Sequence, residues 1–262
     1  DEVLEATAIY SAAGLLNGRP YQAERPFRSP HHTTSYVALV GGGTHPRPGE
    51  VSLAHRGVLF LDEFPEFPRR SLEALRQPLE DGLITVSRAA GQISFPARFT
   101  LVTAENPCPC GYRHDDVKPC ICTYSEIQRY EKRLSGPLID RIDIHVTVPR
   151  VEIADLVSTQ YGEASVVVRE RVCLARRIQT ERLSGSRALT NDEMTSREVN
   201  ELIELNQLAK SLLHKAVDKF KLSARSYTRL IKVSRTIADL SQSELVVPDH
   251  VSEALQYRPI LN

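Results

Sequence analysis

Two adjacent carboxylates, Asp62 and Glu63, follow the apolar run 58–61 and are the clearest candidates for chemistry in the sequence. An uninterrupted apolar run is typical of a short strand that a parallel sheet buries on both faces. Ligands gather at the carboxyl ends of such strands, where one acid can hold the Mg²⁺ of a nucleoside triphosphate and the next can orient an attacking water. The string alone is equally typical of a strand that ends in a solvated turn.

A second strand end carries an amide. Residues 99–104 predict another strand, and Asn106 follows it. An amide beside the acidic strand end can orient the water that Glu63 polarises, whereas an asparagine that only caps the next turn is the alternative. Residues 142–148 alternate between apolar and polar, which predicts a third, half-exposed strand. Arg141 precedes it, where an arginine can form a surface ion pair or reach the triphosphate of a neighbouring subunit.

Four cysteines form two C-x-C pairs that are separated by nine residues: Cys108, Cys110, Cys120 and Cys122. In a reducing compartment, clustered cysteines indicate a metal site before they indicate disulfides, and four thiolates suit a tetrahedral structural Zn²⁺. The spacing is tighter than the usual C-x₂-C, and an iron–sulfur cluster or free thiols are the alternatives. The adjacent pair His31 and His32 is predicted to be solvated or hydrogen-bonded rather than metal-ligating.

Basic residues occupy two places where phosphate could bind. Residues 83–88 and 92–95 predict a β-hairpin, with Arg88 next to its tip as either a solvated turn residue or a contact to a polyanion. On a helix that Ser223 caps, Arg225, Arg229 and Lys232 share one face at positions i, i+4 and i+7. That face is either solvated or, at the helix start, able to meet a phosphate through Arg225 and the backbone amides.

The composition is that of an ordinary globular protein. The chain has 262 residues, and Lys+Arg and Asp+Glu both count 33, so overall charge argues neither for nor against nucleic acid. No apolar run approaches membrane-spanning length and no signal-peptide pattern opens the chain, so we predict a cytoplasmic protein without a membrane partner. Residues 1–16 predict a helix with no preceding strand or methionine, and we expect a fragment of a longer protein.

The chain changes character at Pro149. Residues 1–150 carry the strand signals, which predicts an α/β region in which residues 17–56 form a long, loop-rich segment. Residues 151–185 predict a helical connector, and residues 186–262 predict a compact helical domain. Its helices have clear start signals, among them the capping box from Thr195 to Glu198.

This order of elements resembles the AAA+ ATPases, and within them the magnesium-chelatase-like proteins of the ComM (YifB) type. The strings that carry the resemblance span nearly the whole chain: RPFRSPHHTTSYVALVGGGTHPRPGEVSLAHRGVLFLDE, QPLEDGLITVSRAAGQISFPARF, AENPCPCGY, SGPLIDRIDIHV and SARSYTRLIKVSRTIADL. The resemblance implies an AAA+ P-loop NTPase core followed by an all-α lid domain.

The resemblance also implies roles for single residues. Asp62 and Glu63 would form a Walker B pair, with Asp62 holding Mg²⁺ and Glu63 acting as the catalytic base. Asn106 would be the sensor-1 residue, Arg141 an arginine finger acting in trans, and Arg225 the sensor-2 residue of the lid.

Two further elements have counterparts in the family. Residues of about 27–56 would form the helix-2 insert, and the hairpin would be the pre-sensor-1 hairpin. Both line the pore of ring-forming relatives, which makes Arg88 a candidate DNA contact.

The function implied is that of a hexameric bacterial DNA translocase, driven by ATP and Mg²⁺, that promotes branch migration while transforming DNA is integrated. Two alternatives stay open. One is a magnesium-chelatase motor subunit that drives metal insertion into a porphyrin, which the cysteine cluster favours less. The other is a non-catalytic binding module pinned by zinc.

One family motif does not occur in these 262 residues: there is no G-x-x-x-x-G-K-[ST]. In the family this P-loop lies upstream, so we expect the fragment alone neither to bind ATP tightly nor to hydrolyse it. The P-loop strand lies between the strand of Asn106 and residues 142–148. Its absence leaves unpaired edges, and we expect distortion or intermolecular pairing around residues 138–148.

Overall fold

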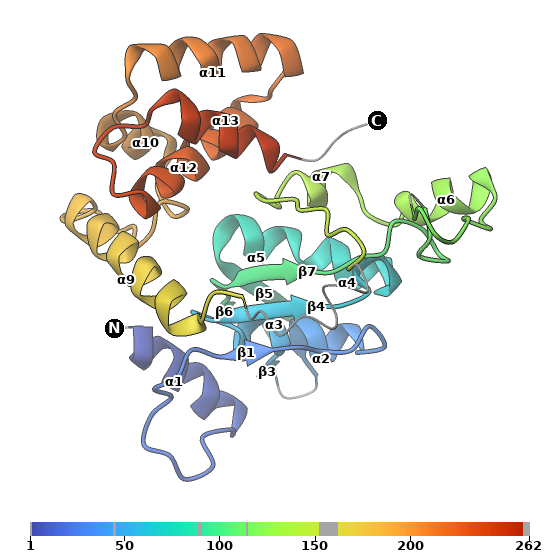
Figure 1. Cartoon of the computed structure of the whole chain (residues 1–262). Coiled ribbons are helices and arrows are strands. Elements are labelled where there is room, and N and C mark those ends of the chain that lie inside the picture. Colours follow the sequence, from blue (N-terminus) through green and yellow to red (C-terminus); the bar gives the residue numbers. More distant parts are fainter. Residues whose placement is uncertain (1, 44–45, 89–90, 114, 152–161, 259–262) are drawn as a thin grey trace. The chain divides into compact units, whose positions relative to one another are not determined.

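The computed structural model describes residues 2–43, 46–88, 91–113, 115–151 and 162–258 (Figure 1). Contacts divide the chain into two compact units, Asp1–Ile142 and Asp143–Asn262, and each is described by itself. Within the described ranges, no helix is both long and apolar enough to cross a membrane. The three-part division predicted from the sequence, with bounds at 150 and 185, stays a prediction.

The first unit is built on a parallel sheet in the order β1 (Phe27–Arg28), β4 (Val58–Leu61), β7 (Thr100–Thr103). Val58 pairs with Phe27 on one side and with Thr100 on the other, and Leu61 pairs with Thr103. Gly57 lets β4 start close to β1, because a Cβ at this position would lie 1.9 Å from the carbonyl oxygen of Pro26. Since all three strands run the same way, the residues after β4 and after β7 meet at one edge of the sheet (Figure 1).

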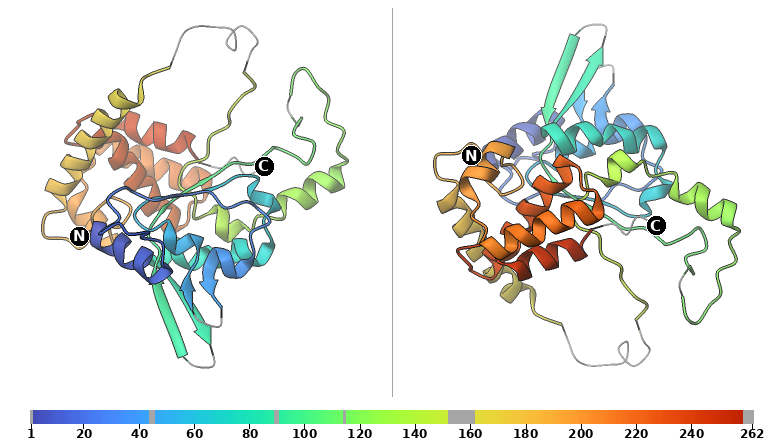
Figure 2. Two further views of the ribbon diagram at one scale, coloured as in Figure 1. Left: turned by 90° about the horizontal axis from the view of Figure 1, so that it is seen from below. Right: turned by 90° about the horizontal axis from the view of Figure 1, so that it is seen from above.

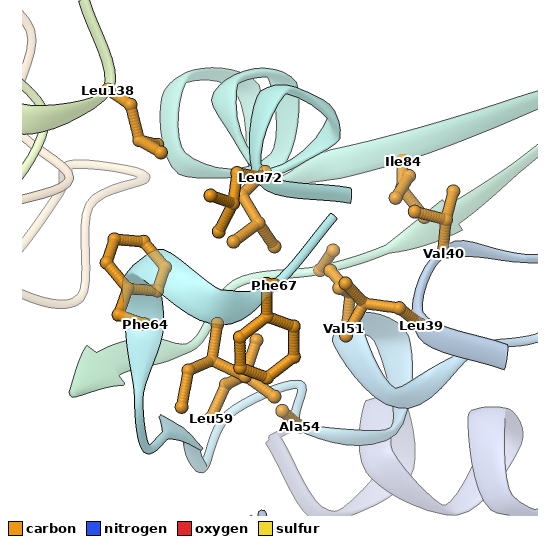
Figure 3. Close-up of a cluster of buried hydrophobic side chains, with 13 residues drawn as sticks. Leu39, Val40, Val51, Ala54, Leu59, Phe64, Phe67, Leu72, Ile84 and Leu138 are labelled. Carbon is orange, nitrogen blue, oxygen red and sulfur yellow. The ribbon is translucent and has the colours of Figure 1, made fainter. Parts of the chain in front are cut away.

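One face of β4 carries the core. Leu59 and Leu61 are fully buried, whereas Val58 and Phe60 are half-buried, so the predicted burial on both faces is wrong. On the more open face, Phe60 stacks on Phe27 with ring centroids 6.3 Å apart. Figure 3 shows the core that the covered face joins, which includes Leu39, Val40, Val51, Ala54, Phe64, Phe67, Leu72, Ile84 and Leu138.

Short helices cover this core. They are α2 (Tyr36–Val40), α3 (Glu50–Leu53), α4 (Arg69–Ala74), α5 (Arg76–Asp81) and α7 (Gly136–Ile139), whereas α1 (Glu2–Ala13) contributes no residue to this cluster. Leu72, Leu75 and Leu79 have the spacing of a single helix, but the helix is divided at Leu75 into α4 and α5. Pro78 is the physical cause. Its nitrogen carries no hydrogen to donate to the carbonyl of Ala74, and its ring clashes with that carbonyl. Gly82 then ends α5 in the left-handed conformation, at φ 66°.

Two antiparallel pairs complete the strands of this unit. The predicted hairpin is confirmed as β5 (Leu83–Arg88) and β6 (Gly91–Pro96), and Figure 2 shows it projecting from the rest of the unit. The second pair, β2 (Gly41–Gly42) with β3 (Arg47–Pro48), lies in the loop-rich segment. After β7, a long loop leads to α6 (Tyr124–Glu131).

The third strand predicted for residues 142–148 is wrong. After α7 the chain turns and continues to residue 151 without joining any strand of the described structure. Alternating side chains form a strand only where a neighbour pairs with the backbone, and no described strand does so here. Ile144, Val146 and Val148 are accordingly exposed. The distortion or intermolecular pairing that a missing P-loop strand would cause around residues 138–148 stays a prediction.

The second unit is helical. Its described residues form α9 (Ser165–Arg182), α10 (Ser196–Leu202), α11 (Gln207–Phe220), α12 (Ala224–Leu240) and α13 (Pro248–Gln256). The predicted starts are confirmed, since Thr195 and Glu198 form a capping box and Ser223 accepts a hydrogen bond from the Ser226 amide. In α9, Ala175 and Gln179 are buried, whereas Cys173 is exposed.

A buried charge network holds α12 to α9. The carboxylate of Asp239 is fully buried and accepts two hydrogen bonds from Arg182, at 2.6 and 2.7 Å. Arg235 donates to it at 3.0 Å and Asn191 at 2.8 Å. A buried charge is tolerated when it is paired and hydrogen-bonded in this way.

Candidate functional site

The acidic turn after β4 is held by the backbone of β7. The amide of Ala104 donates to the carbonyl of Leu61 at 3.1 Å, and the amide of Phe64 donates to the carbonyl of Ala104 at 3.0 Å. Phe64 is buried, whereas both Asp62 and Glu63 are exposed. The turn therefore anchors itself in the core and presents two carboxylates to solvent.

Glu63 has a left-handed backbone, with φ 50° and ψ 45°. Its amide donates to Asp62 Oδ1 at 2.8 Å, which stabilises this conformation locally. A non-glycine residue pays about 1–2 kcal/mol for the left-handed region, and such strain is concentrated at functional sites. The bend turns the Glu63 side chain away from the line of the strand and toward the loop after β1.

Two histidines of that loop meet Glu63. His32 Nδ1 lies 2.8 Å from Glu63 Oε2, and the rings of His31 and His32 are 4.0 Å apart. His31 in turn contacts the Thr33 hydroxyl at 2.9 Å. Both histidines make polar contacts, as predicted, but the prediction that they do not ligate a metal stays a prediction, and their contact with Glu63 was missed. The ligand atoms of these three residues lie within 4.8 Å of one another, a spacing that could also hold a metal ion.

Asn106 follows β7 at the same edge of the sheet and is exposed. The backbone of Asn106 hydrogen-bonds the hydroxyl of Tyr130, a buried residue of α6 whose pKa is raised by burial. The structure thus brings the strand ends of Glu63 and Asn106 together, as the order of the strands predicted.

Arg141 faces its own unit. Its guanidinium pairs with Glu80 and donates to the carbonyl of Pro137, and its side chain is only 10% exposed. Within this unit it is not brought to the acids after β4. A role in trans stays a prediction.

The basic face of α12 is divided by its contacts. Arg229 Nε lies 2.6 Å from Asp143 Oδ1, and Lys232 donates to the carbonyl of Asp192 at 2.5 Å. Burial lowers the pKa of Lys232 and raises that of Asp143. Arg225, in the first turn, is the exposed member of the three.

The four cysteines converge in the loop between β7 and α6. Cys108 Sγ lies 3.4 Å from Cys110 Sγ and 3.7 Å from Cys120 Sγ, and Cys110 and Cys120 are 3.6 Å apart. All four sulfurs lie within 4.8 Å of one another. Disulfide sulfurs are about 2.05 Å apart, whereas ligands at about 2.3 Å from a tetrahedral metal are about 3.8 Å apart. The spacing fits one tetrahedral metal ion.

Backbone amides around the cysteines also favour a metal site, because they stabilise a thiolate. Those of Tyr112 and Ile121 donate to Cys110 and lower its pKa to about 6. Burial and the neighbouring sulfurs raise the pKa of Cys122 to about 12. A cation among the four sulfurs would stabilise the thiolate at every position.

Arg88 is the last residue of β5, where it pairs with Gly91. Its side chain and the tip at residues 89–90 lie outside the described part of the structure, so its DNA contact stays a prediction.

Comparison with known proteins identifies the family. The profile described as "Magnesium chelatase, subunit ChlI" matches residues 1–156, and that of the subunit ChlI C-terminal region matches residues 162–258. The chain belongs to the magnesium chelatase subunit ChlI family. This family is AAA+ ATPase-like, which agrees with a parallel-sheet unit followed by a helical one.

The curated relatives that match this chain carry different names. Competence protein ComM of Haemophilus influenzae is 49% identical over 99% of this chain and 50% of its own length. Uncharacterized protein YifB of Escherichia coli is 43% identical over the same shares. DNA replication licensing factor mcm2 of Schizosaccharomyces pombe is 22% identical over 79% of this chain and 26% of its own. The chain spans about half the length of the bacterial relatives.

Proposed function

We propose that this chain is part of a ring-forming ATPase motor that translocates DNA, of the kind that drives branch migration in natural transformation and recombination. The observation that carries the proposal is the pair of exposed carboxylates at the end of the middle strand, tied by backbone hydrogen bonds to the strand end that leads to Asn106. Ring formation and DNA are supported by the likeness to a competence protein and to a DNA replication licensing factor.

The residues divide the chemistry of ATP hydrolysis among them. Asp62 would hold the Mg²⁺ that neutralises charge on the β- and γ-phosphates. Glu63 accepts the proton of the attacking water, and Asn106 orients that water. Arg141 of a neighbouring subunit stabilises charge that develops on the phosphate, once it leaves Glu80, and Arg225 contacts the nucleotide from the lid.

The cysteine loop would hold a structural Zn²⁺. The distances of 3.4 to 3.7 Å between the sulfurs of Cys108, Cys110 and Cys120 support one tetrahedral ion, with Cys122 as the fourth ligand. Such an ion stabilises a loop that is too polar to form a core of its own.

A chelatase motor is the second candidate, because the matching profile is that of a magnesium chelatase subunit. Both candidates use the same ATPase centre and differ in the partner that the motor moves. DNA dependence of the ATPase therefore separates them.

The test is an ATPase assay of the full-length protein with and without forked DNA, together with Glu63→Gln. Loss of a general base costs about 10²–10⁴-fold in rate, so we expect hydrolysis to fall by that factor. Glu181→Gln is the matched control, an exposed acid on α9, and should leave the rate unchanged. An ATPase rate that is the same with and without forked DNA would refute the proposal that the protein is a DNA translocase. A Glu63→Gln variant that hydrolyses ATP at the wild-type rate would refute the assignment of Glu63 as the general base.

A further inference from the structure

A pocket of about 370 Å³ adjoins the acidic turn on the side of α6. We call it the basic pocket. Its walls come from two places in the first unit, the turn that follows Glu63 and the last turn of α6 with the residues after it. Its lining residues are Pro65, Glu66, Phe67, Pro68, Arg69, Arg129, Lys132 and Arg133.

Four of these side chains are cations and one is an acid. Glu66 is engaged by Arg133 at 2.5 Å, and Arg133 also donates to the carbonyl of Pro65 at 3.2 Å. Within the described ranges, the side chains of Arg69, Arg129 and Lys132 make no hydrogen bond or ion pair. The pocket therefore presents three cations that form no direct ion pair, and the only carboxylates that act on them through space are Glu73, toward Arg69, and Glu126, toward Arg129, among the residues that the structure describes.

Nearby acids are occupied elsewhere. Glu126 receives hydrogen bonds from Thr123 at the start of α6, and Glu131 pairs with Arg113. Cations in the last turn of a helix stabilise it through the helix dipole, which accounts for Arg129 and Lys132 but not for Arg69, which comes from another element. Convergence of cations from two elements costs repulsion that a bound anion would relieve.

The exposure of the cations indicates the kind of anion. Arg69, Arg129, Lys132 and Arg133 are all exposed, so they offer an open surface to a chain of phosphates rather than enclosing one group. Arg129, Lys132 and Arg133 follow each other at i, i+3 and i+4, on one side of the α6 axis. The aromatic ring in the wall, Phe67, is only 3% exposed and cannot stack on a base. Recognition would therefore use phosphates and not bases.

We propose that the basic pocket binds the phosphate backbone of a single nucleic-acid strand. This deepens the proposed function by naming a place where the motor meets its DNA, and it rests on DNA being the partner. Because the contacts are to phosphates, affinity at this site depends on salt and not on base sequence.

The experiment measures binding of a fluorescein-labelled single-stranded oligonucleotide to the full-length protein by anisotropy, between about 50 and 200 mM salt. The variant is Arg69→Gln/Arg129→Gln/Lys132→Gln. Arg133 is left intact because it also holds the turn after the acids through Pro65 and Glu66. The matched control removes three exposed charges of α11, as Lys210→Gln/Lys215→Gln/Lys219→Gln.

Each phosphate contact contributes about 0.7 to the slope of log K against log salt for a single strand, so three lost contacts reduce the slope by about 2. Over a fourfold change in salt, the affinity of the wild type should fall about 20-fold more than that of the variant. The α11 control should keep the wild-type slope, and circular dichroism should show the same fold in all three proteins.

Two results separate the ways of failing. If the wild type binds DNA and the basic-pocket variant keeps its affinity and slope, the site is wrong while the proposed function stands. If the wild type does not bind DNA at low salt, the proposed function itself fails. A variant that binds DNA normally but loses ATP hydrolysis would also overturn the inference, because the cations would then serve the nucleotide.

Discussion

Asp239 provides a sharp test of how the helical unit is stabilised. Its carboxylate is fully buried and accepts hydrogen bonds from Arg182, Arg235 and Asn191. The substitution Asp239→Ala leaves two guanidinium groups near one another without their shared counter-charge. Removing one partner of a buried ion pair costs about 3–5 kcal/mol, and we expect that loss in the free energy of unfolding of this unit.

The loss can be expressed as a change in melting temperature. The second unit runs from residue 143 to residue 262. With about 2.1 cal/mol/K of unfolding entropy per residue, 1 kcal/mol corresponds to about 4 °C for a unit of that size, so the transition should fall by about 12–20 °C. The assays are calorimetry of the full-length protein and hydrogen exchange of α12, whose protection should fall by about two to four orders of magnitude.

Two controls make the reasoning refutable. Asp218→Asn removes an exposed acid of α11 and should change the melting temperature little. Replacing Asp239, Arg182 and Arg235 together by leucine should cost less than Asp239→Ala, because no buried charge is then left unpaired. A loss below about 1 kcal/mol for Asp239→Ala would show that the network contributes no more than a surface ion pair, and the reasoning would be wrong.

Other predictions concern the metal site and pH. The purified protein should contain one equivalent of zinc per chain by plasma mass spectrometry, and Cys110→Ser should lower it while Cys173→Ser, an exposed cysteine outside the cluster, should not; equal zinc in both variants would contradict the site. Burial lowers the pKa of His55 from 6.5, so the folded state favours the neutral ring and stability should fall as pH drops below 6.5 toward the folded pKa. His55→Asn keeps an acceptor for the amide of Arg98 and should weaken the pH dependence of the free energy of unfolding, as measured by urea titration. If that free energy depends on pH between 5 and 7 as strongly in the variant as in the wild type, groups other than His55 cause the dependence.

Local signals predicted most elements, and non-local pairing explains the errors. The apolar run before Asp62, the hairpin and the caps at Thr195 and Ser223 depend on neighbours in the sequence and are confirmed. The division at Leu75 was also predictable, because Pro78 cannot occupy a helix interior. In residues 142–148, apolar and polar residues alternate as in a strand. This alternation indicates which side chains would lie on which face of a sheet, but it does not show whether a partner strand is present.

The candidate site was predicted in part. Placing Glu63 and Asn106 at one edge required only two parallel strands, which the sequence indicated. The contact between His32 and Glu63 was missed because β1 has only two residues and gives no periodic signal. Once β1 is known to lie beside β4, the loop that follows it must also reach the acidic edge. The basic pocket joins two groups of residues that lie sixty or more positions apart, which no local pattern reveals.

The backbone hydrogen bonds between β4 and β7 continue past both strands, through Ala104, to the residue after Glu63. These hydrogen bonds hold the strand end that carries the acids and the strand end that leads to Asn106 in one fixed arrangement. In the proposed ATPase ring, hydrolysis would be regulated through the parts of the site that these hydrogen bonds do not fix, namely the rotation of the Glu63 side chain against His32 and the arrival of groups from outside the sheet. The rate of the proposed motor's cycle would then depend on side-chain rotation and on residues of neighbouring subunits, while the backbone at this end of the sheet stays in place.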